Sequence, residues 1–121
     1  MSMRFNGDTG ANYSVQRMYT TGGTPGYQSS QNSSDISPGL AVWANSTVPL
    51  LMNIDIMSYA SSAYKTCLVQ LSQIATSSGW NAQTAHTWRS SSAINEITIF
   101  DTMSNGFGVG SSAVLYGIKA A

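Results

Sequence analysis

Residues 4–14 encode two backbone reversals close to the start of the chain, and they limit the fold more than any other feature of the sequence. Asn6-Gly7 is the pair that a tight two-residue hairpin turn demands, because both central residues of that turn need positive φ. Asp8 and Gly10 lie in a run of turn-forming residues that is typical of a second reversal. We therefore expect a β protein whose Asn6, Gly7, Asp8 and Gly10 are structural turn residues.

Strand candidates recur at short intervals after these turns. Each is bounded by Gly, Pro, Asn or Ser and is rich in β-branched and aromatic residues. The segment 64–74 fits either a strand or a helix by its spacing, and its Cys, Val, Thr and Tyr favour a strand. The predicted strands cover residues 13–19, 40–45, 52–57, 64–74, 94–100 and 113–119, with a loop and a short strand between Trp80 and Trp88.

About seven or eight strands with almost no helix predict one all-β domain over residues 1–121, an antiparallel β-sandwich of jelly-roll type. A chain of 121 residues is long enough to bury one core. The stretch 20–39 contains four glycines, two prolines and many serines without a sustained period. We expect it to be a long loop that either contacts a partner or is disordered.

The surface is expected to be neutral and polar. Only 8% of the residues are charged and the formal net charge is zero, whereas an average soluble domain has about 25% charged residues. The few basic residues are scattered, which disfavours nucleic-acid binding. Copies of such a chain repel one another weakly, and this favours an oligomer. No apolar stretch is long enough to span a bilayer and residues 1–4 do not start a signal peptide, so we expect synthesis in the cytoplasm without membrane insertion.

Cys67 and His86 are each the only residue of their type. A single cysteine allows no disulfide within the chain, and its apolar surroundings predict a buried thiol. No Gly-x-Ser-x-Gly string accompanies His86, so we expect an exposed strand residue rather than a catalytic base. The acidic residues lack the regular spacing of a calcium loop, and neither a metal nor a cofactor is expected.

Asp8-Thr9-Gly10-Ala11 is similar to the active-site motif of retroviral-type aspartic proteases. Those enzymes place the aspartate at the end of a buried apolar strand, where two carboxylates share one proton. Here Asn6-Gly7 precedes the aspartate, and residues 115–118 match the second motif of that family only loosely. A turn is the favoured interpretation, and a protease is retained as a remote alternative.

The tryptophans raise the question of a binding surface. Trp43 lies in a short apolar strand and is expected in the core, whereas Trp80 and Trp88 have polar neighbours. A packed loop, a subunit interface and a platform for glycans all fit those two residues. With Tyr27 of the long loop, Trp80 and Trp88 are the candidate interface or glycan contacts.

Residues 4–14 also resemble a segment of a β-sandwich module found in virion proteins of tailed bacteriophages. Residues 55–61, Lys65-Thr66 and residues 110–118 are similar to later parts of that module, so the resemblance spans nearly the whole chain. It implies a non-enzymatic structural protein of the virion, either a capsid decoration or cement protein or a component of a tail fibre. The alternative is a carbohydrate-binding module of a tail fibre that recognises host glycans.

The resemblance also implies partners. Such modules carry further strands upstream of the segment that resembles residues 4–14, so we expect another subunit to cover a sheet edge there. The implied partners are other virion proteins and further copies of the chain.

Overall fold

The computed structural model describes residues 1–37, 48–74, 79–102 and 106–118. Within these ranges the protein is all-β and contains no helix, and thus none that could cross a membrane. The predicted fold class, an antiparallel β-sandwich with about seven or eight strands, is confirmed. The strands are β1 (Ser2–Phe5), β2 (Tyr13–Thr21), β3 (Thr24–Ser33), β4 (Leu51–Met57), β5 (Lys65–Ile74), β6 (Gly79–Trp88) and β7 (Ile97–Phe100).

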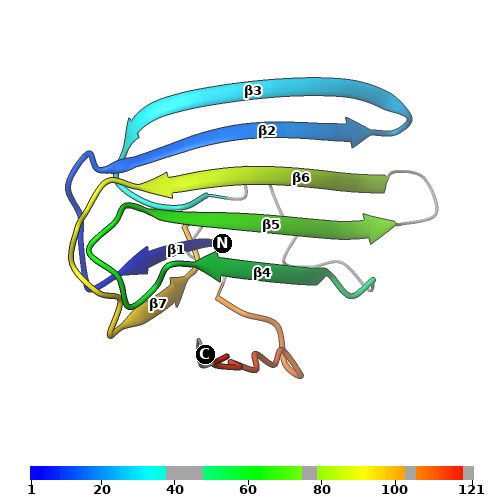
Figure 1. Cartoon of the computed structure of the whole chain (residues 1–121). Helices are drawn as coiled ribbons and strands as arrows, with labels where there is room; N and C mark the ends of the chain where they lie inside the picture. The colour runs from blue at the N-terminus through cyan, green and yellow to red at the C-terminus, as the bar shows by residue number, and fades with distance from the viewer. Residues whose placement is uncertain (38–47, 75–78, 103–105, 119–121) are drawn as a thin grey trace.

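The strands form two antiparallel sheets of unequal size. The large sheet has the order β3-β2-β6-β5-β4, and the small sheet pairs β1 with β7 (Figure 1). Side chains of β1 pack against β2, β5 and β6. The large sheet therefore has an inner face, which carries the core, and an outer face, which points away from the small sheet.

Alternation along the strands separates these two faces. Val15 and Arg17 of β2 are buried on the inner face, and so are Cys67, Val69 and Leu71 of β5. The residues between them are exposed or half-buried. The strand interpretation of residues 64–74 is therefore confirmed.

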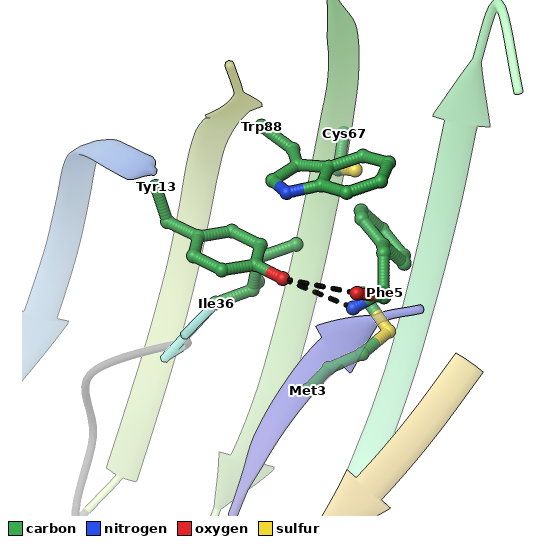
Figure 2. Close-up of a cluster of buried hydrophobic side chains, with 6 residues drawn as sticks. All are labelled: Met3, Phe5, Tyr13, Ile36, Cys67 and Trp88. Atoms are coloured by element: carbon green, nitrogen blue, oxygen red, sulfur yellow. Dashed lines mark hydrogen bonds between the residues drawn. The ribbon is translucent and has the colours of Figure 1, made fainter. Parts of the chain in front are cut away.

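Six buried side chains join the two sheets (Figure 2). The ring of Trp88 is stacked on Tyr13 at 6.4 Å between centroids and meets the edge of Phe5 at 5.5 Å. The Tyr13 hydroxyl accepts a hydrogen bond from the Phe5 backbone N–H at 3.1 Å. The cluster consists of Met3, Phe5, Tyr13, Ile36, Cys67 and Trp88.

The Asn6-Gly7 turn is present, but it does not join two paired strands. Asn6 and Gly7 have φ values of 51° and 65°, and the Asp8 N–H donates to the Phe5 carbonyl at 2.9 Å. The strand before the turn pairs with β7, and β2 pairs with β3 and β6. Asn6 and Gly7 are thus turn residues, as predicted, but the turn leads from one sheet to the other, and Phe5 pairs with Ile97.

The long loop predicted at residues 20–39 is also wrong. β2 and β3 form a hairpin around Gly22 and Gly23, whose φ values are 54° and 86°. The strand was missed because β3 is a polar edge strand without an apolar face. Gly26 of this strand pairs with Tyr19, and glycine suits the position because a Cβ there would lie 2.5 Å from the Tyr19 ring.

Two further strand predictions need correction. Residues 79–88 form one continuous strand, β6, rather than a loop and a short strand. The last strand was predicted at residues 113–119, but its described residues, 113–118, are exposed and pair with no strand within the described ranges. The strand predicted at 40–45, with Trp43, lies outside the described residues.

Candidate binding face

The outer face of the large sheet carries a row of neutral side chains that crosses all five strands. The row is built by cross-strand pairs, each joining one strand to the next. In the order β3 to β4 its members are Tyr27, Met18, Gln83, Gln70 and Asn53. Three side-chain amides thus stand side by side next to a tyrosine and a methionine.

A second row runs beside the first and is equally poor in charge. It is formed in the same way, and its members are Ser29, Gln16, Ala85, Leu68 and Asp55. Asp55, on the edge strand β4, carries the only formal charge in the two rows. Away from Asp55, the face can therefore bind a neutral polar partner without desolvating ions.

The members of these rows on β3, β2, β6 and β5 line a shallow hollow of about 520 Å³. The side chain of Tyr27 is 89% exposed and that of Met18 is 66% exposed. Gln70 and Gln83 also line a neighbouring hollow of about 260 Å³, which extends toward Leu51. An exposed ring beside amide donors and acceptors suits a ligand with an apolar face and several hydroxyl groups.

The three aromatic residues singled out from the sequence are not brought together. Tyr27 lies on the outer face. Trp80 is half-buried on the inner face and is stacked on Tyr19, with 6.3 Å between ring centroids. Trp88 is only 2% exposed and belongs to the core, so its selection as an interface or glycan contact is wrong.

Asp8 and Gly10 form the second reversal, in which the Asp8 carboxylate accepts three hydrogen bonds. One carboxylate oxygen accepts from the Gly10 N–H at 2.8 Å, and the other accepts from Asn12 Nδ2 at 3.0 Å and Trp88 Nε1 at 2.7 Å. Partial burial raises the pKa of Asp8, but these hydrogen bonds outweigh it and the pKa lies below its ordinary value. The carboxylate is thus held ionised as a structural acceptor.

The prediction that His86 is exposed is wrong. Its side chain is 1% exposed on the inner face of β6, where Nε2 lies 2.9 Å from the Thr84 hydroxyl. Burial, reinforced by the positive charge of Arg17, lowers the pKa of His86 to about 4. The imidazole is therefore neutral near pH 7.

The prediction that Cys67 is a buried thiol is confirmed. Its side chain is fully buried, and this burial raises the pKa of the thiol to about 12. Across the described ranges, no three His, Cys, Asp or Glu side chains are grouped so that they could hold a metal ion.

The outer face was missed in the sequence because its residues lie in five separate strands that only the pairing register aligns. The available signal was the alternation in β2 and β5, which places Gln16, Met18, Leu68 and Gln70 opposite the buried residues. Comparison of the chain with protein-family models, curated proteins and solved structures finds no match.

Proposed function

We propose that the protein is a non-enzymatic structural subunit of a tailed-phage virion, a capsid decoration or cement protein or a component of a tail fibre. The observation that supports this role is the apolar surface of residues 106–118, which we call the C-terminal segment. Its large side chains are all at least half exposed; they are those of Phe107, Val109, Val114, Leu115, Tyr116 and Ile118.

An apolar stretch of this kind favours assembly over catalysis. Burying apolar surface stabilises a contact by roughly 25 cal/mol per Å², and contiguous exposed apolar patches mark interaction sites. The low overall charge leaves little repulsion between copies. A subunit that functions through contacts with neighbours accounts for both features.

The experiment is to locate the chain on purified virions. An antibody against the chain is applied to particles of the phage that encodes it, and bound antibody is imaged by electron microscopy. We expect regular labelling of the capsid surface or of a fibre. Particles that contain no copies of the chain, by labelling and by mass spectrometry, would contradict the proposal.

A second candidate function, recognition of a host glycan, is favoured by the outer face. Tyr27 offers a ring for stacking on a sugar, and Gln70 and Gln83 offer hydrogen bonds to hydroxyl groups. On a glycan array we expect Tyr27→Ala to lose binding. Tyr64→Ala is the matched control, because Tyr64 is also exposed, at 60%, but lies outside the two rows. Equal binding by both variants would exclude this face as the glycan site.

A further inference from the structure

We propose that residues 113–118 pair, as an added strand, with the open edge of β4 in a second copy of the chain. This inference rests on the proposed function as an assembling subunit and names the contact by which copies associate. The partner it requires is another molecule of the same protein. Two features of the described chain support it. One is a segment that has the sequence of a strand but is unpaired, and the other is an edge strand whose inner apolar side chains are only half-buried.

The donor is the end of the C-terminal segment. Val114, Tyr116 and Ile118 alternate with Ala113, Leu115 and Gly117, a period that puts the first three on one face of an extended strand. In the described chain residues 113–118 belong to no strand, and every one of them is exposed. The segment has the sequence of a strand but pairs with no neighbour among the residues that the structure describes.

The acceptor is one of the two edge strands of the large sheet. β3 is polar, and its Pro25 has no N–H to donate, so it suits an apolar partner poorly. β4 instead carries Met52, Ile54 and Ile56 on its inner face, and all three are half-buried although they flank the core. Among the described residues β4 pairs with β5 alone, and its second edge is open within those ranges.

The two surfaces fit each other in size and character. β4 is 7 residues long, which is enough to pair with all of residues 113–118. With Val114, Tyr116 and Ile118 turned inward, the added strand would continue the apolar layer beyond Ile54. Its backbone would satisfy the unpaired groups of the β4 edge, as in other cases of strand addition.

A second copy is the partner because the donor and acceptor are both unoccupied within one described chain (Figure 1). Each molecule then offers one donor and one acceptor. Mutual exchange between two copies closes a dimer around a two-fold axis, whereas one-way donation produces a ring or a filament. In all three arrangements the mass in solution exceeds that of one chain.

The first test measures the mass of the full chain over a concentration series by light scattering. We expect the wild type to be oligomeric, and we expect the Val114→Asp, Tyr116→Asp double variant to dissociate with a constant raised about a hundredfold or more. Tyr27→Asp with Tyr64→Asp is the control, because it adds the same charge at exposed tyrosines elsewhere. Wild-type association by the Val114 and Tyr116 variant, or a wild type that stays monomeric throughout, would overturn the inference.

The second test identifies the edge by disulfide formation between two different variants mixed together. Leu115→Cys is combined with Asn53→Cys on β4 or, as the control, with Ser29→Cys on β3, while the buried Cys67 stays inert. We expect cross-linked dimers with Asn53→Cys only. Equal yields with both strands, or no cross-link between Leu115→Cys and Asn53→Cys, would overturn the inference.

The outcomes separate this inference from the proposed function. Virions that carry the chain, together with a failed cross-link, would leave the structural role intact and remove the β4 contact. A successful cross-link, together with virions that lack the chain, would support the β4 contact and contradict the structural role in the virion.

Discussion

The indole Nε1 of Trp88 donates a hydrogen bond to Oδ2 of Asp8 across 2.7 Å, although the two residues are 80 positions apart in the sequence. The bond ties the end of β6 to the reversal that follows β1. Trp88 is buried in the core and Asp8 is partly exposed, so the carboxylate fixes how the indole enters the cluster shown in Figure 2.

Asp8→Ala is expected to lower the free energy of unfolding by about 2–3 kcal/mol, because it leaves the buried indole N–H and the Gly10 N–H without their acceptor. Denaturant unfolding measures the change, and Thr9→Ala, at the exposed neighbouring position, is the control. In a double-mutant cycle with Trp88→Phe, we expect a coupling energy of about 1–2 kcal/mol. A coupling near zero would show that the bond does not contribute to stability.

Lys65 is a second residue on which the core depends. Its side chain is fully buried, and Nζ donates to the carbonyls of Ser61 at 2.8 Å and Ala63 at 2.5 Å, beside the Trp88 ring. Lys65→Met keeps an apolar stem but removes the donor, and we expect a loss of about 3 kcal/mol in unfolding experiments. Thr66→Ala, at the next and exposed position, should change stability by less than about 0.5 kcal/mol. Similar values for the two variants would contradict this account.

Stability is expected to fall as the pH decreases from about 6.5 to about 4, because of His86. Its pKa is lowered to about 4 in the folded protein from an ordinary value of 6.5, so in this window the unfolded chain binds a proton that the folded chain does not. The loss approaches about 3 kcal/mol across the window. Urea unfolding at a series of pH values measures it.

His86→Gln supplies the control for the pH experiment. Glutamine is neutral at every pH tested and can still form a hydrogen bond with Thr84. We expect this variant to lose most of the slope between pH 6.5 and 4. A slope unchanged from the wild type would assign the pH dependence to other groups.

The sequence predicted the strands whose two faces differ in polarity. β2, β4 and β5 each alternate between mainly apolar inner residues and mainly polar outer residues, and that period is visible without a structure. β3 has no such period because it is a polar edge strand. Residues 113–118 have this period, but they pair with no strand among the described residues. A sequence pattern indicates that a segment can form a strand, but it does not indicate which sheet edge the segment joins.

The wrong predictions for Trp88 and His86 have one physical cause. In β6 the buried face includes Thr84 and His86 as well as Trp88, so polar residues occupy both faces of the strand. The polar neighbours of Trp88 therefore indicated an exposed position, when half of them were buried with it. Only the pairing of β6 between β2 and β5 shows that this strand is central.

Asn6 offers a test of how the first turn is held. Its side chain donates to the Ala93 carbonyl at 2.8 Å and accepts from the N–H groups of Asn95 and Glu96 at 3.0 and 3.1 Å, while its φ is 51°. Asn6→Ala should cost about 3 kcal/mol, because it removes these bonds and strains the backbone. Asn6→Gly removes the bonds without the strain and should be about 1 kcal/mol more stable than Asn6→Ala in denaturant unfolding. Asn6→Asp keeps the acceptor and should be the mildest of the three. If the alanine variant were as stable as the glycine variant, the positive φ would carry no cost, and the turn would be held by the side-chain hydrogen bonds alone.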